Sequence, residues 1–219
     1  MKHLFIYIFY LCLLSVCVHA RPISYPGAWT VMQKNNWESS RLHVHYSPKK
    51  TYSVGSVIEY FHNSHHKDIL AQLNYLVKRK NTPYTQANIY AKTSIGAKFT
   101  PQKQHLVYQA SLDADWESRR YFSSFSTRFS YVNAIDAGSF HHHARIGIAP
   151  YVADYGNLHT WFMLQADFFP QSLANSFEGI YQNNQLIISA LCRFFKGIYL
   201  FEIGINENKD LLLNWIVRL

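Results

Sequence analysis

Apolar and polar residues alternate one by one along most of this chain, and helical spacing is hard to find. Around residue 90, for example, Ala87, Ile89 and Ala91 alternate with Asn88 and Lys92. A period of two is the pattern of a β-strand with one apolar and one polar face. The pattern recurs in twelve stretches, which we take as candidate strands: 29–33, 42–46, 52–60, 69–78, 86–95, 106–116, 121–131, 144–152, 159–168, 186–194, 199–206 and 211–219.

The length of these stretches bears on where their apolar faces point. Several, such as 106–116, exceed the ~5–6 residues of a typical globular strand and match the ~9–11 residues of a tilted membrane-crossing strand. Alternation by itself fits both a soluble barrel with an apolar core and a membrane barrel with an apolar outside. Strand length, taken with the two ends of the chain, favours the membrane barrel.

Both ends of the chain agree with export to a membrane. The last stretch keeps one face apolar up to Leu219, as the closing strand of an outer-membrane barrel does. Residues 1–20 combine a basic start, an apolar run and a small-residue site before Arg21, which predicts a cleaved secretory signal peptide. We therefore expect residues 21–219 to form one domain in the outer membrane of a Gram-negative cell.

The predicted fold class is all-β: an antiparallel up-and-down transmembrane β-barrel of twelve strands, or of ten if the first hairpin takes no part in closure. Both termini then lie on the periplasmic side, with short turns there and longer loops on the outer surface. The longest outer loop is expected over 170–184.

Composition narrows the range of partners. The formal net charge is +8, but Lys and Arg are scattered along the chain, which argues against nucleic acid and favours contact with anionic outer-membrane lipid and lipopolysaccharide. Once the signal is removed only Cys192 remains, so no intramolecular disulfide can form. The chain carries no phosphate-binding Gly-rich loop, CxxC or HExxH motif.

Short motifs along the whole mature chain resemble a family of small, largely uncharacterised proteobacterial proteins, which are predicted outer-membrane or periplasmic β-proteins. The motifs are Arg21–Gly27 with Trp29-Thr30, Val44-His45-Tyr46-Ser47-Pro48, Gln72–Arg79, Asp115-Trp116-Glu117, Leu158-His159-Thr160-Trp161 and Asn214–Arg218. The resemblance implies a barrel-like fold, assembly by the barrel-assembly machinery and an association with heavy-metal efflux components. It supplies no catalytic residues, and the chain ends in Leu219 where the family more often has Phe.

Histidine is the candidate metal ligand. We predict a Zn or Cu site at the outer rim, because imidazole is the commonest protein ligand for these metals. The candidate ligands are His62, His65, His66, His141, His142 and His143. The alternative is that exposed loops tolerate histidine, or that histidine meets lipopolysaccharide phosphates there. His43 and His45 form a second, inward-facing pair.

Charged residues occur on the inward faces of the predicted strands. Such charges require water or an opposite charge, which fits a hydrated lumen braced by ion pairs. The main candidates are Asp113, Arg128, Arg145, Glu202 and Arg218, and Lys78 and Lys92 are also expected to point inward.

Three functions compete at this stage. The favoured one is a narrow passive pore or envelope structural protein, without enzymatic activity. The second is a periplasmic or surface metal-binding protein accessory to heavy-metal efflux. The third is an outer-membrane lipid-directed hydrolase, in which Ser139 near His141, or Ser64 near His65, would act as an activated nucleophile.

Overall fold

Twelve antiparallel β-strands make up the computed structural model of this chain, which describes residues 23, 25–133, 137–153, 156–170 and 184–219. The predicted signal peptide, 1–20, and most of the predicted outer loop at 170–184 lie outside the described residues. In the part that is described, no helix has the length and hydrophobicity needed to cross a membrane. The strands are β1 (Ala28–Asn35), β2 (Ser39–Lys49), β3 (Tyr52–Phe61), β4 (Lys67–Asn81), β5 (Thr85–Phe99), β6 (Gln104–Ser118), β7 (Tyr121–Val132), β8 (Ala137–Ile148), β9 (His159–Phe169), β10 (Gln185–Lys196), β11 (Tyr199–Asn206) and β12 (Leu211–Arg218).

The sheet closes on itself. Each strand pairs with its neighbours in sequence, and β1 pairs with both β2 and β12. At the seam the Trp29 amide donates to the Leu219 carbonyl at 2.8 Å, and the Leu219 amide donates to the Trp29 carbonyl at 2.9 Å. The twelve-stranded prediction is confirmed. The ten-stranded alternative is wrong, because the first hairpin supplies the strand that completes the ring.

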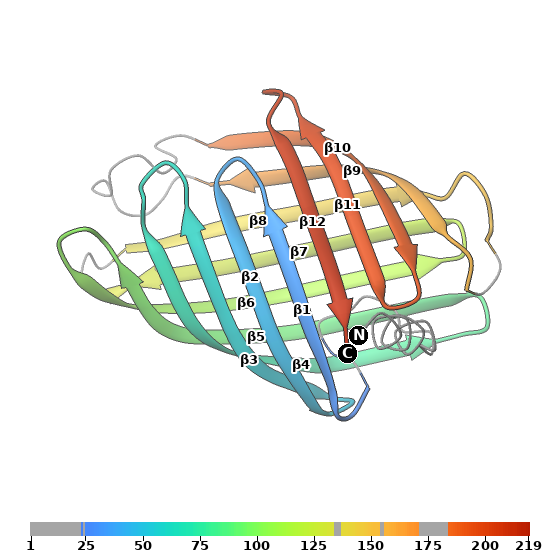
Figure 1. Ribbon diagram of the computed structural model, residues 1–219, viewed down its shortest axis with the longest axis horizontal. Helices are drawn as coiled ribbons and strands as arrows, with labels where there is room; N and C mark the ends of the chain where they lie inside the picture. The colour runs from blue at the N-terminus through green and yellow to red at the C-terminus, as the bar shows by residue number, and fades with distance from the viewer. Residues whose placement is uncertain (1–22, 24, 134–136, 154–155, 171–183) are drawn as a thin grey trace, which may run out of the picture.

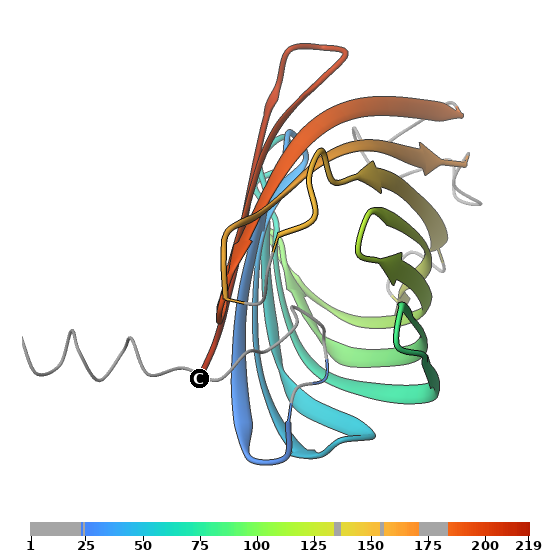
Figure 2. The ribbon, with the colours of Figure 1, turned by 90° about the vertical axis from the view of Figure 1, so that its right-hand side faces the viewer.

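The strands are strongly tilted. In Figure 1, β11, β12, β1 and β2 run steeply across the front, while β6 to β9 cross behind them. Figure 2 shows the same walls from the side, curving toward one another around the barrel interior. Crossing of opposite walls is the geometric result of closing a tilted, twisted sheet.

The barrel is apolar outside and polar inside. On β4, Ile69, Leu73 and Tyr75 are exposed on the outer surface, whereas Gln72 and Asn74, the residues between them, are buried. The same reversal recurs around the ring, where buried polar residues include Glu59, Gln165, Asp167, Glu202 and Asn214. A water-soluble barrel would place these two sets the other way round, so the arrangement matches that of a membrane barrel.

A β-bulge changes one predicted orientation. The β4–β5 register shifts between Leu76 and Lys78, so that Lys78 lies opposite Ile89 and Arg79 lies opposite Asn88. Ile89 is on the outer surface, which places Lys78 there too, while the Arg79 guanidinium reaches inward and donates to the Asn88 side chain at 2.7 Å. The prediction that Lys78 faces the lumen is wrong because one extra residue reverses the alternation.

Glycines on the inner face permit the close approach of adjacent strands. A Cβ on Gly96 would lie 2.0 Å from the Ile69 carbonyl oxygen, and one on Gly55 would lie 2.1 Å from the Val44 carbonyl oxygen. Both neighbours are backbone atoms, so they cannot move aside without shifting a strand. These glycines therefore mark places where the wall bends too tightly for a side chain.

We predict that Gly96→Ala destabilises the folded barrel by about 1–3 kcal/mol, the usual cost of overpacking a tight site. Urea unfolding of protein folded in detergent micelles measures this, with Ser94→Ala, two residues away on the same face, as the matched control. Equal stability of the Gly96 variant and the wild type would contradict the assignment of a tight bend.

Candidate functional site

The barrel encloses a cavity of about 900 Å³. At the end where β1 begins and β12 finishes, its lining includes Thr82, Asn157 and Gly197, which belong to the connections between strands. At the opposite end it includes Asn36 and Glu38, from the β1–β2 connection. The cavity therefore runs between the two ends of the barrel.

The first charged cluster in this lumen is centred on Glu202 of β11. Arg145, which comes from β8, donates to both carboxylate oxygens at 3.0 and 3.1 Å. Arg193 on the neighbouring β10 donates at 2.7 Å, and the Asn214 amide of β12 donates at 2.8 Å. Because β8 and β11 are not neighbours, the Arg145 pair connects separate parts of the wall.

The second cluster is centred on Glu59 of β3. The Arg41 guanidinium of β2 lies 3.2 Å from the carboxylate, and the Arg128 guanidinium of β7 lies 3.8 Å from it. The Ser39 hydroxyl donates to the other carboxylate oxygen at 2.9 Å. Arg128 and Glu59 again join strands that are not neighbours, so this pair also crosses the lumen.

All five predicted lumen charges point inward. Asp113 pairs with Lys92 and Ser126, and Arg218 is buried at the end of β12. Basic and acidic residues line the cavity in equal numbers. Seven are basic (Lys34, Arg41, Lys92, Arg119, Arg128, Arg145, Arg193) and seven are acidic (Glu38, Glu59, Asp113, Asp115, Glu117, Asp167, Glu202). Because the two signs offset one another, the average electrostatic field in the lumen is weak.

The six predicted metal ligands do not gather at one place. His62, His65 and His66 lie on the β3–β4 connection, where the His62 ring nitrogen is 3.0 Å from the Ser40 hydroxyl and His65 contacts Tyr60. The other three lie within β8, which begins at Ala137, so they belong to the barrel wall. The candidate strand at 144–152 is expected to begin after these histidines, but strand pairing with β7 already begins at Ala137.

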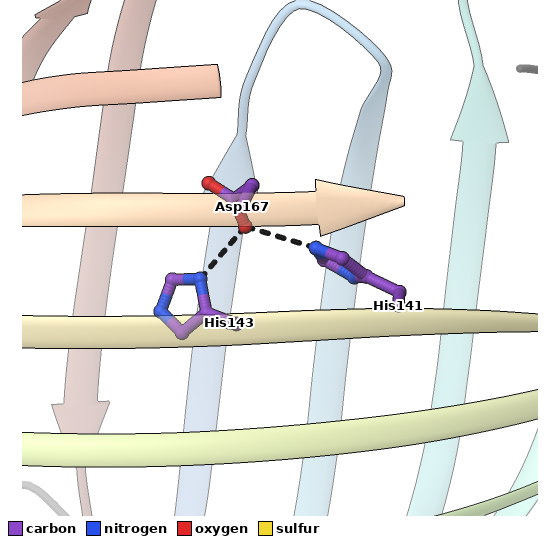
Figure 3. Close-up of side chains that lie close together, drawn as sticks. All are labelled: His141, His143 and Asp167. Atoms are coloured by element: carbon purple, nitrogen blue, oxygen red, sulfur yellow. Dashed lines mark hydrogen bonds and ion pairs between the residues drawn. The ribbon is translucent and has the colours of Figure 1, made fainter. Parts of the chain in front are cut away.

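Alternation along β8 divides its three histidines. His142 lies on the outer face, where its ring is 6.1 to 6.3 Å from the rings of Phe125, Phe140 and Phe168. His141 and His143 point into the lumen and meet Asp167 of β9, as Figure 3 shows. Among the residues that the structure describes, these are the one group of three or more potential metal-ligating side chains.

The inward pair His43 and His45 is also buried, with ring centroids 6.3 Å apart. For the hydrolase hypothesis, His141 is the relevant base, and its Nε2 bonds to Asp167. Within the described contacts, no hydrogen bond joins Ser139 to His141 or Ser64 to His65.

Glu38 is a lumen residue that sequence reasoning did not single out. It sits in the short β1–β2 connection, outside the alternating stretches, so no face could be assigned to it. Burial in the mouth of the lumen, followed by repulsion from Glu59 and Asp167, raises the pKa of Glu38 to about 8. This carboxyl group is thus largely protonated at neutral pH.

Comparison with solved structures identifies the architecture. The KdgM porin superposes with a TM-score of 0.55 over 87% of this chain and 97% of that chain, at 7% sequence identity. The chain shares the fold of the KdgM porin. A second solved chain, from work on the in-meso crystallization of membrane proteins, is 13% identical with a TM-score of 0.48 over 88% of this chain and 83% of its own. No protein-family profile and no curated protein sequence matches.

We predict that Glu202→Gln destabilises the barrel by about 3 kcal/mol, because Arg145 and Arg193 are left with uncompensated charge in a buried site. Glu207→Gln is the matched control, since this carboxylate is exposed beyond β11. Urea unfolding of both variants provides the comparison. A Glu202 variant as stable as the control would show that the cluster does not brace the wall.

We also predict a pH-dependent contribution from Glu38. Its pKa in the folded state lies above the unfolded value, so the protonated form stabilises the fold at low pH, and this stabilisation is lost as pH rises from about 4.5 to about 8. Glu38→Gln, which stays neutral, should match the wild type near pH 5 and exceed its stability at pH 9. Urea unfolding at pH 5 and at pH 9 tests this. If the difference in stability between the variant and the wild type is the same at both pH values, the raised pKa of Glu38 is refuted.

Proposed function

We propose that this protein is a narrow passive pore of the Gram-negative outer membrane. The observation that carries the proposal is a polar, charge-lined cavity that runs between both ends of a closed barrel with an apolar outer wall. Such a wall is stable in hydrocarbon because each strand of the closed ring pairs its backbone groups with a strand on both sides. Similarity in fold to the KdgM porin also supports a role as a pore.

The side chains on the outer surface support a location in the outer membrane. Exposed aromatic side chains lie near the strand ends on the side where β1 begins and β12 finishes, at Trp29, Trp116, Tyr121 and Tyr199. Others lie near the strand ends on the opposite side, at Tyr60, Phe140 and Phe168. Aromatic residues at both edges of an apolar band are typical of outer-membrane barrels. Export by a signal peptide over 1–20, insertion by the barrel-assembly machinery and contact with lipopolysaccharide belong to the same proposal.

The size of the lumen limits the solute. Spread over an apolar band of ~25 Å, the cavity has a mean width of roughly 7 Å. Trp161, Met163 and Leu212 pack against one another and fill part of the interior. A passage of this kind suits small hydrated ions and small polar molecules. The balanced lining charges suit weak selectivity between anions and cations.

We predict small, steady single-channel currents in planar lipid bilayers, with a reversal potential in a KCl gradient that shows weak selectivity. Glu59→Gln should move selectivity toward anions, and Arg128→Gln should move it toward cations. These two residues form one ion pair, so the opposite shifts control for each other.

A heat-modifiability gel first establishes that each preparation is folded. A folded wild-type protein that fractionates with the outer membrane but carries no current would refute the pore and leave the envelope structural role. Shifts of the same sign in both variants would refute the electrostatic account of selectivity.

A further inference from the structure

We infer that His141, His143 and Asp167 form a binding site for a divalent transition metal inside the lumen, with Zn²⁺ as the probe. The site differs from the predicted outer-rim site in its place and in its ligands: it uses two of the six predicted histidines and adds a carboxylate. Its existence requires the barrel alone. Its effect on ion flow rests on the proposed pore function.

Strand register brings the three ligands together. His143 lies directly opposite Asp167 in the β8–β9 pair, and His141 follows two residues away on the same face. Cross-strand neighbours and residues two apart on one face are the closest contacts that a sheet provides. The site is therefore built on two rigid, paired strands, and all three residues line the cavity.

The distances suit a metal ion. His141 Nε2 lies 2.9 Å and His143 Nδ1 lies 2.8 Å from the same oxygen of Asp167, and the candidate ligand atoms all lie within 4.8 Å of one another. Tetrahedral Zn²⁺ binds imidazole nitrogen and carboxylate oxygen at ~2.0–2.2 Å, which places neighbouring ligand atoms about 3.3 Å apart. Each nitrogen therefore needs to move only a few tenths of an ångström from the Asp167 oxygen, and the two nitrogens, which lie no more than 4.8 Å apart, can reach the same ion by rotation of their side chains.

Surrounding contacts hold the ligands in place. The Gln165 amide donates to the second oxygen of Asp167 at 2.6 Å, which leaves the first oxygen for the two imidazoles. The His141 ring stacks on Phe169 with centroids 4.3 Å apart and planes 4° from parallel. Contacts of this kind fix ring and carboxylate orientation, and they resemble the outer partners that support metal ligands in proteins.

The ligand set determines the class of metal. Two imidazoles and one carboxylate favour Zn²⁺ and its late first-row neighbours over Mg²⁺ or Ca²⁺, which prefer oxygen ligands. A fourth ligand would come from the lumen, as water or a passing solute. Because each imidazole must lose a proton from the nitrogen that faces the metal, binding weakens as pH falls.

Isothermal titration of the folded full chain in detergent with ZnCl₂ tests the site. At pH 7.5 we expect one Zn²⁺ per chain with a Kd in the micromolar range, and weaker binding at pH 5.5. Asp167→Asn and His143→Ala should each weaken binding by about tenfold or more. His142→Ala is the matched control, since it removes the adjacent imidazole on the opposite face.

A measurement on the wild type keeps the test valid if a variant fails to fold. Zn²⁺ should protect His141 and His143, but not His142, from modification by diethyl pyrocarbonate, as mapped by mass spectrometry. No Zn²⁺ binding, equal protection of all three histidines, or equal losses in the His142 and His143 variants would overturn the site.

The consequence for ion flow is measured separately. In planar bilayers Zn²⁺ should reduce the wild-type current, and the Asp167→Asn variant should resist it. Zn²⁺ binding in a protein that carries no current would refute the pore and leave the metal site standing. Current that is insensitive to Zn²⁺ at saturating binding would refute only the location of the metal in the conduction path.

Discussion

Closure of the sheet is the constraint on which the rest of this structure depends. A strand whose outer face meets hydrocarbon has no water to satisfy its backbone, so every amide and carbonyl must pair with a neighbouring strand. The seam between β1 and β12 provides this, with six paired positions from Thr30–Arg218 to Asn35–Leu213. Without that seam two strand edges would be left with unpaired backbone groups.

Closure also decides where polar side chains must go. Since the outer face is apolar, the interior collects the charges, and these must satisfy one another within low-dielectric walls. One continuous set of contacts runs from Asn214 and Glu202 through Arg145 and Gln165 to Asp167. The lumen is therefore braced by the same groups that make it polar.

The carboxylates inside the barrel differ in what their partners can do. Glu59 and Glu202 face arginines, which keep their charge at all accessible pH values and do not bind metals. Asp167 faces two imidazoles, which are common metal ligands in proteins. Two acidic centres are thus suited to holding the wall, and the third carries the ligand set of the proposed metal site.

The sequence by itself determined the strands, their number and the face of nearly every residue, because alternation with period two is a local property. The alternation gives Arg128, Arg145 and Glu202 inward positions, and in the structure these residues take part in ion pairs of the lumen. It failed at Lys78, where a single bulge residue reversed the faces, and at Glu38, which lies between strands.

Only the tertiary structure decided which inward residues meet, since this depends on register and on which walls oppose one another after closure. Asp167 lies 24 residues after His143 in the sequence, and the β8–β9 register brings it within hydrogen-bonding distance of both His141 and His143.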